Sequence, residues 1–311
     1  MKPRIIFFGT PKFACAILQE LIDEKQNIVA VVSQPDKPVG RKKVIEKTPV
    51  HQLAEENGIP VVQPAKLRSE TESVLAYEPD LIITCAYGQF VPESILKAPR
   101  YGCLNIHPSL LPKYLGGAPV HRAVMNGDAE TGVCLMEMVK AMDAGAVYAC
   151  CRTPITPDMT TEELNLVLEK DAAALLRENL PLYLEGKLTP QEQDESQVVL
   201  APNISREEEF VRFAEEDVHT AYNHIRALID WPIACGTIGG KRIKFYRARM
   251  EECAHDQAPG TVTGFEEGAM KIAAKGGYIK VLELQMEGKN RMKASDFANG
   301  AGRGLIGKAF D

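Results

Sequence analysis

The sequence predicts two domains of different classes, a parallel α/β sheet followed by a small β-barrel. In the first half, short apolar runs alternate with helical patterns, as expected for a parallel sheet covered by helices on both faces. After residue 233 the pattern changes to short strands separated by glycine-rich turns, which is typical of a small barrel. A chain of 311 residues can also form two cores. We therefore expect one domain over residues 1–185, a linker over 186–205 and a second domain over 206–311.

The first predicted domain consists of buried strands and the helices that connect them. Apolar runs predict strands over residues 4–8, 28–33, 59–62, 80–86 and 102–106. Helical periodicity predicts helices over residues 13–24, 49–57, 69–77 and 92–96, and a polar loop is expected over 34–47. Ligands of such sheets bind beyond the carboxyl ends of the strands, so the site is expected there.

The middle of the chain is predicted to complete the first domain and lead into the second. Two further strands are expected over 131–138 and 146–154, and a long helix over 160–180. Residues 160–163 supply a capping start for this helix, and Pro181 supplies a kink or a stop. Polar residues 186–203 read as a linker, and a helix is expected over 207–228.

Charge and cysteine usage narrow the class of protein. A net charge of -6 argues against general coating of nucleic acid but leaves room for a local basic contact. The 8 cysteines include no C-x-x-C pair, so we expect no metal and reduced thiols rather than a disulfide framework. No signal peptide is evident, and no segment approaches the roughly 20 apolar residues of a membrane span. We expect a cytoplasmic protein that does not contact membranes.

The candidate catalytic residues are Asn105, His107 and Asp143. Alternation along the predicted strand places Asn105 and His107 on one face, near its carboxyl end. An amide and an imidazole there can donate hydrogen bonds to a developing oxyanion, and the imidazole can relay a proton. A carboxylate beside His107 would fix its tautomer. Taken alone, the Asn-x-His pair is equally compatible with a structural role, and Asp143 before Ala-Gly is more simply explained as a turn residue.

Several stretches of the sequence together resemble one enzyme family. They include GTPKFA from residue 9, QPDKPVGR from residue 34, and residues 105–112, 116–122, 127–133, 142–145, 231–232, 241–243 and 288–297. With these stretches the chain resembles the formyltransferases that use 10-formyltetrahydrofolate. The first two are more specific to the branch that acts on transfer RNA. The resemblance spans essentially the whole chain.

The resemblance implies a reaction, a fold and a set of binding residues. The formyl group of 10-formyltetrahydrofolate would pass to the free amino group of initiator methionyl-tRNA, for translation initiation. The fold would be a Rossmann-like catalytic domain followed by an OB-like barrel that binds transfer RNA, with no metal. Folate binding is assigned to Ser109, Leu110, Leu111, Pro112, Tyr87 and Gly88, although the two leucines could be ordinary core. Transfer-RNA binding is assigned to Arg41, Lys42, Lys43, Lys241, Arg242 and Lys244.

The second domain also contains a basic stripe, defined as Lys241, Arg242, Lys244, Arg247 and Arg249. On one regular strand, Arg242 and Lys244 would share a face and the other three cations would share the opposite face. Charge on both faces suits an exposed edge strand. Such a stripe is suited to contact an RNA backbone, and a plain solubility face is the alternative.

Two departures from the family pattern and three alternatives stay open. Leu115 stands where the transfer-RNA branch usually has Arg, and Ala144 stands where Thr is common. An N-formyltransferase for an amino sugar would keep the same catalytic residues without needing a basic loop. A non-catalytic RNA-binding protein on this scaffold is disfavoured by the intact Asn105, His107 and Asp143, and a formyltetrahydrofolate hydrolase by the lack of an extra regulatory domain. We expect a monomer.

Overall fold

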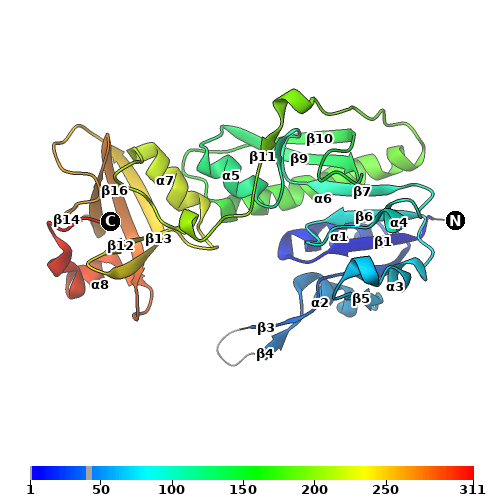
Figure 1. The fold of residues 1–311 in the computed structure, drawn as a ribbon, viewed down its shortest axis with the longest axis horizontal. Coiled ribbons are helices and arrows are strands. Elements are labelled where there is room, and N and C mark those ends of the chain that lie inside the picture. Colours follow the sequence, from blue (N-terminus) through cyan, green and yellow to red (C-terminus); the bar gives the residue numbers. More distant parts are fainter. Residues whose placement is uncertain (1, 40–43) are drawn as a thin grey trace. The chain divides into compact units, whose positions relative to one another are not determined.

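Two separate cores organise the part of the chain that the structure describes (Figure 1). The computed structural model describes residues 2–39 and 44–311. Unit 1 comprises Met1–Gly116, Thr131–Thr153 and Asn165–Leu200, whereas unit 2 comprises Gly117–Glu130, Pro154–Leu164 and Ala201–Asp311. The domain boundaries and the linker predicted from the sequence stay a prediction.

Among the described residues, unit 1 is built on a 7-stranded sheet in the order β10-β9-β7-β6-β1-β2-β5. These strands are β1 (Ile5–Gly9), β2 (Ile28–Val32), β5 (Val61–Val62), β6 (Leu81–Cys85), β7 (Cys103–His107), β9 (Glu130–Glu137) and β10 (Val147–Pro154). Strands β5, β2, β1, β6 and β7 pair in parallel, and β9 joins β7 in antiparallel register. Every residue of β1 and β6 is buried, which explains their unbroken apolar runs. The predicted parallel α/β sheet is confirmed.

Helices pack on this sheet with the apolar faces that the sequence indicates. The elements are α1 (Lys12–Asp23), α2 (Pro49–Glu56), η1 (Leu67–Ser69), α3 (Glu72–Leu75), α4 (Glu93–Leu96) and α6 (Thr161–Leu184). Helix α1 buries Ala14, Ile17, Leu18 and Leu21. At the start of α6, Glu163 N donates to Thr160 Oγ1 while Thr160 N donates to the Glu163 carboxylate, so the capping start is confirmed. The helix predicted over 69–77 is only the short pair η1 and α3.

Two expectations for unit 1 were wrong. The segment expected to be a polar loop over 34–47 contains β3 (Lys37–Val39) and β4 (Val44–Glu46), an antiparallel pair of only 3 residues each, too short to show an apolar alternation. The cysteines are not all reduced, because Cys134 on β9 and Cys150 on β10 form a disulfide. These strands are neighbours, and the two Cα atoms are 4.2 Å apart. Cysteine spacing alone does not reveal such a cross-strand pair.

The polar segment that precedes unit 2 is attached to unit 1 at several points. It contains η2 (Glu195–Gln197) and β11 (Val199–Leu200). Strand β11 pairs in parallel with β8 (Lys113–Leu115), and Gln191 forms a β-bridge with Val147. Because these contacts are made to residues far away in sequence, composition alone does not predict them.

Unit 2 is built on an antiparallel sheet in the order β12-β13-β16-β15-β14, with β17 beside β16. The strands are β12 (Cys235–Ile238), β13 (Lys241–Glu252), β14 (Val262–Glu266), β15 (Ala269–Ala274), β16 (Gly277–Met286) and β17 (Met292–Lys293). The last residues of the chain form hydrogen bonds with both edge strands of this sheet, β14 and β12. Val262 N of β14 donates to Lys308 O at 2.8 Å, and Asp311 N donates to Thr237 O of β12 at 2.9 Å. The expectation of a second, antiparallel β domain is confirmed.

Short helices complete unit 2, and one of them differs from its prediction. They are α5 (Pro119–Met125), η3 (Glu207–Glu209), α7 (Val218–Ala227), α8 (Ala294–Ala298) and η4 (Ala301–Leu305). The helix predicted over 207–228 forms only as α7, which Asp217 caps by accepting a hydrogen bond from Thr220 N. Before it, Val211 and Phe213 are both buried in the core of unit 2, so tertiary packing overrides the helical pattern there.

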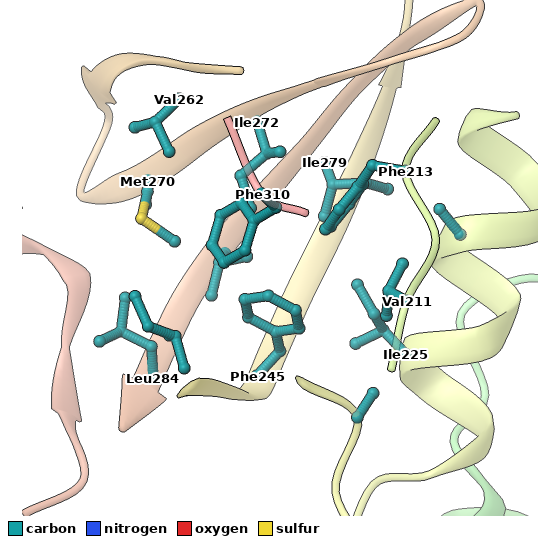
Figure 2. Close-up of a cluster of buried hydrophobic side chains, with 14 of the residues drawn as sticks. Val211, Phe213, Ile225, Phe245, Val262, Met270, Ile272, Ile279, Leu284 and Phe310 are labelled. Atoms are coloured by element: carbon teal, nitrogen blue, oxygen red, sulfur yellow. The ribbon is translucent and has the colours of Figure 1, made fainter. Parts of the chain in front are cut away.

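Three phenylalanine rings fill the core of unit 2 (Figure 2). The ring of Phe310 lies 5.5 Å from that of Phe213 and 5.6 Å from that of Phe245, measured between centroids. A Cβ atom on Gly236 would lie 2.6 Å from the Phe310 ring, so a larger residue there would displace it. The last residues of the chain are therefore part of the core. No helix among the described residues is both long and apolar enough to cross a lipid bilayer.

We expect Phe310→Ala to destabilise unit 2 by about 3–5 kcal/mol, because it removes a buried ring and leaves a cavity. Hydrogen exchange of the β13 and β16 amides measures the opening free energy of this unit. The matched control is Ile306→Ala, since Ile306 is 50% exposed in the same terminal segment. Equal effects of the two substitutions would show that Phe310 does not anchor the core.

Candidate active site

The predicted catalytic residues Asn105 and His107 lie in β7, and Asp143 lies in the loop between β9 and β10. His107 and Asp143 come together, with 3.8 Å between His107 Nδ1 and Asp143 Oδ1. Their side chains are only 5% and 15% exposed, so water weakens their electrostatic interaction less than at the surface. Asp143 adopts a left-handed backbone conformation with φ 50°. Residues 36 positions apart in sequence thus form one polar pair.

The imidazole of His107 is oriented by a backbone carbonyl. Its Nε2 atom lies 2.9 Å from Tyr114 O. Because a carbonyl oxygen only accepts hydrogen bonds, Nε2 carries the hydrogen and Nδ1 is the nitrogen that faces Asp143. The distance of 3.8 Å is too long for a direct hydrogen bond between Nδ1 and the carboxylate. The other carboxylate oxygen, Oδ2, accepts a hydrogen bond from Gly116 N at 2.9 Å.

The carboxamide of Asn105 is oriented by Thr84 on the neighbouring strand. Thr84 and Asn105 are register partners in the β6–β7 pair, and Thr84 is 3% exposed. The Thr84 hydroxyl lies 2.8 Å from Asn105 Oδ1, 3.2 Å from Leu104 O and 3.0 Å from Met138 Sδ, and we assign its one hydrogen to the shortest of these contacts, Asn105 Oδ1. This bond fixes the amide oxygen, so the Nδ2 group of the partly exposed Asn105 remains as the donor.

The Asp143 loop is held in place by a residue of the polar segment before unit 2. Gln193 Nε2 donates to Asp143 O at 2.7 Å and to Gly145 O at 2.8 Å. A Cβ atom on Gly145 would lie 2.0 Å from Glu137 O, so only glycine permits this close approach. Thr84, Tyr114 and Gln193 were not predicted, since nothing in their local sequence signals contacts with distant residues.

The residues assigned to folate binding lie on two loops of unit 1. Ser109 follows β7 and is buried, and its hydroxyl has no partner among the described residues. Leu110, Leu111 and Pro112 are partly exposed, in contrast to ordinary core residues. Leu115, the departure from the family pattern, is buried at the end of β8.

The second of these loops contains Tyr87 and Gly88. The Tyr87 ring packs edge-on against Phe8 at 5.1 Å, and burial raises the pKa of its hydroxyl. Its carbonyl oxygen accepts hydrogen bonds from Thr10 Oγ1 and Gln34 Nε2. Gly88 has a φ of 89°, a conformation that favours glycine. The roles of the folate-binding residues stay a prediction.

Only three of the six residues assigned to transfer-RNA binding lie in the described part of the chain. Arg41, Lys42 and Lys43 lie outside the described residues. In unit 2, Lys241 is exposed, Arg242 lies 4.0 Å from the Glu209 carboxylate, and Lys244 Nζ donates to Pro232 O at 3.3 Å. Within the described ranges, no three His, Cys, Asp or Glu side chains are grouped to hold a metal ion.

The geometry predicted for the basic stripe was only partly right. Strand β13 lies between β12 and β16 over residues 241–244, whereas the described pairings of its later part, which carries Arg247 and Arg249, are with β16 alone. The register also shifts, because Phe245 pairs with Leu284 but Arg247 pairs with the next residue, Glu283. Ala248 then pairs with Val281, so Tyr246 on β13 and Leu282 on β16 are both skipped and the overall register is kept. Phe245 and Ala248 both pack on the core of unit 2, so Arg247 and Arg249 lie on the same outer face as Arg242 and Lys244.

Comparison with known proteins identifies the family of this chain. The model of the family described as "Formyl transferase" matches residues 3–180. The chain belongs to the formyl transferase family. The model described as "Formyl transferase, C-terminal domain" matches residues 203–302. The formyl transferase resemblance seen in the sequence is thus confirmed for both halves of the chain.

Relatives of this formyl transferase have similar lengths. The methionyl-tRNA formyltransferase of Bacillus cytotoxicus is 45% identical over 96% of this chain and 96% of its own length. That of Bacillus licheniformis is 42% identical over 96% of this chain and 95% of its own length. The sequence relationship therefore extends through both units.

Solved structures share the fold at lower identity. HypX from Aquifex aeolicus has a TM-score of 0.70 and 19% identity over 99% of this chain. This chain spans only 50% of that protein. An N-formyltransferase from Helicobacter canadensis has a TM-score of 0.67 and 17% identity, over 90% of this chain and 99% of its own. At such identities the likeness shows the fold alone.

Proposed function

We propose that this formyl transferase moves the formyl group of 10-formyltetrahydrofolate to the amino group of initiator methionyl-tRNA, for translation initiation. The observation that carries the proposal is the 45% identity to a methionyl-tRNA formyltransferase over 96% of both chains. The amino-sugar alternative has only distant support, because the N-formyltransferase from Helicobacter canadensis is 17% identical to this chain. We also propose that the protein acts in the cytoplasm as a monomer.

In this reaction the amine nitrogen bonds to the formyl carbon, and the bond between that carbon and N10 of the folate then breaks. Negative charge develops on the formyl oxygen in the tetrahedral intermediate. Asn105 Nδ2 is the donor that stabilises this charge, since Thr84 occupies the amide oxygen. The buried position of Thr84 keeps the amide oriented before the substrates bind.

His107 takes up the proton that the amine releases, and Asp143 stabilises the charge that results. A proton is then given to N10 as the folate leaves. The hydrogen on His107 Nε2 is bound to the Tyr114 carbonyl, so Nδ1 is the nitrogen that takes up and returns a proton. When Nδ1 is protonated, the Asp143 carboxylate at 3.8 Å stabilises the imidazolium charge. The imidazolium in turn stabilises the oxyanion beside Asn105.

The binding residues are proposed from the family resemblance. A run of four residues begins two positions after His107 and is suited to hold the folate near the catalytic residues: Ser109, Leu110, Leu111 and Pro112. Tyr87 and Gly88 lie on the second loop. Arg41, Lys42, Lys43, Lys241, Arg242 and Lys244 are proposed to contact transfer RNA. No metal is proposed.

We expect Asn105→Ala to lower kcat by about 10²–10³-fold, because it removes an oxyanion donor. The assay contains purified protein, 10-formyltetrahydrofolate and either methionyl-tRNA or a panel of amino sugars, and scores the formylated product. The wild type should formylate methionyl-tRNA. The matched control, Asn57→Ala, changes an exposed asparagine of unit 1 and should retain activity. Formylation of an amino sugar alone would reject the proposed acceptor, and normal turnover by Asn105→Ala would reject the role of Asn105.

Thr84→Val should lower kcat about tenfold with little change in the KM for either substrate. Valine has nearly the same shape but cannot bond to Asn105 Oδ1, so the amide loses its orientation at a cost of about 1–1.5 kcal/mol. Thr84→Ser keeps the hydroxyl and should recover most of the activity. If both substitutions gave the same kcat, Thr84 would act only as a packing residue.

A further inference from the structure

Unit 2 contains a cavity of about 410 Å³ that lies outside the catalytic residues. It is lined by the segment that leads into α6, by α7 and by the middle of β13, which lies beside α7 (Figure 1). Three arginines face it, Arg226 from α7 and Arg247 and Arg249 from β13. Arg247 and Arg249 belong to the basic stripe, for which the sequence suggests an RNA contact, whereas the sequence does not single out Arg226 or indicate a cavity.

The three arginines keep donor groups available. Arg226 is 4% exposed, and it donates only to neutral oxygens, from Nη1 to Met159 O and from Nε to Asn223 Oδ1. Arg247 and Arg249 are exposed. Within the described part of the chain, none of the three forms an ion pair with a carboxylate. Burial lowers the pKa of Arg226, and the nearby charge of Asp158 offsets only part of this effect, so the buried guanidinium lacks a directly bonded anion, which is costly in a protein that does not use it.

Two acidic residues also line the cavity, but both are already engaged. Asp158 Oδ1 accepts a hydrogen bond from the Tyr222 hydroxyl at 2.8 Å. Glu163 is the capping residue of α6, and its Oε2 accepts hydrogen bonds from Thr160 N and Thr160 Oγ1. Three guanidinium groups against two engaged carboxylates leave a positive excess. The cavity therefore suits an anion with several oxygen acceptors, and arginine forks match phosphate in this way.

The surroundings of the cavity favour a polymeric anion. Because of the irregular pairing at Tyr246 and Leu282, Arg247 and Arg249 continue the outer-face row begun by Arg242 and Lys244. A row of cations that leads into a cavity with room for more than one phosphate group matches consecutive phosphates of one backbone, whereas a free phosphate would use the cavity alone.

We propose that this cavity binds a backbone phosphate of the transfer RNA, with Arg247 and Arg249 as the phosphate-binding residues and Arg226 at its buried side. The inference rests on the proposed function for the identity of the RNA. It extends the RNA contact along β13, beyond Lys241, Arg242 and Lys244, into a defined pocket of unit 2.

The test is the double variant Arg247→Gln/Arg249→Gln in the full chain. We expect the Kd and the KM for methionyl-tRNA to rise about tenfold, because charge-assisted hydrogen bonds are lost, with kcat unchanged at saturation. The slope of log affinity against log salt should become shallower by about 1 for each lost phosphate contact. Arg303→Gln is the matched control, since Arg303 is an exposed arginine of unit 2 that does not line the cavity. It should leave both quantities unchanged.

Two further measurements separate the possible outcomes. Thermal unfolding of the double variant should match the wild type, since both arginines are exposed. Inorganic phosphate, added at constant ionic strength, tests for a small-anion site. If phosphate stabilises only the wild type while RNA affinity and its salt slope are the same in both proteins, the proposal is wrong. Binding of transfer RNA is measured separately from formyl transfer. A wild-type protein that binds transfer RNA through these arginines but does not formylate it would contradict the proposed function and leave the inference about the cavity intact.

Discussion

The hydrogen bond between His107 Nε2 and the Tyr114 carbonyl is the interaction on which the site depends. Because it assigns the hydrogen to Nε2, it leaves Nδ1 as the nitrogen that faces Asp143. Both side chains are almost fully buried, so their mutual position is set by the protein rather than by solvent. The other neutral tautomer would present an N–H to Asp143 and leave Nε2 without a hydrogen for the Tyr114 carbonyl. The chemistry proposed for the pair follows from this one orientation.

Distant segments then hold the other polar groups in place around this ring. Thr84 reaches Asn105 from the adjacent strand, and Gln193 holds both ends of the short turn that contains Asp143. Thr84 bonds to Asn105 Oδ1, which leaves Asn105 Nδ2 as the donor for the oxyanion. Gln193 bonds to the backbone oxygens of Asp143 and Gly145, which leaves the Asp143 carboxylate to face His107. Such preorganisation lowers the reorganisation that charge development requires in the transition state. Gln193 belongs to the polar segment that the sequence indicates is only a linker, so this segment also contributes to the site.

Much of the fold could be predicted because buried parallel strands have continuous apolar sequences. The runs at β1 and β6 and the apolar face of α1 indicate their positions directly. The catalytic candidates followed from strand alternation and the family resemblance. The disulfide between Cys134 and Cys150 could not be predicted, since it depends on which strands are neighbours. The irregular pairing at Tyr246 and Leu282 likewise depends on how β13 meets β16, and it places Arg247 and Arg249 on the face of Arg242 and Lys244 instead of the opposite face.

The most direct test of this account is the tautomer of His107, measured by 15N NMR of the ring nitrogens in the full-length protein. The neutral ring should carry its hydrogen on Nε2, with Nδ1 showing the chemical shift of an unprotonated nitrogen. The hydrogen bond from His107 Nε2 to the Tyr114 carbonyl predicts this tautomer in the protein without bound substrates. A neutral ring protonated on Nδ1 would contradict the account, because His107 could then neither bond to Tyr114 nor take up a proton on the side of Asp143.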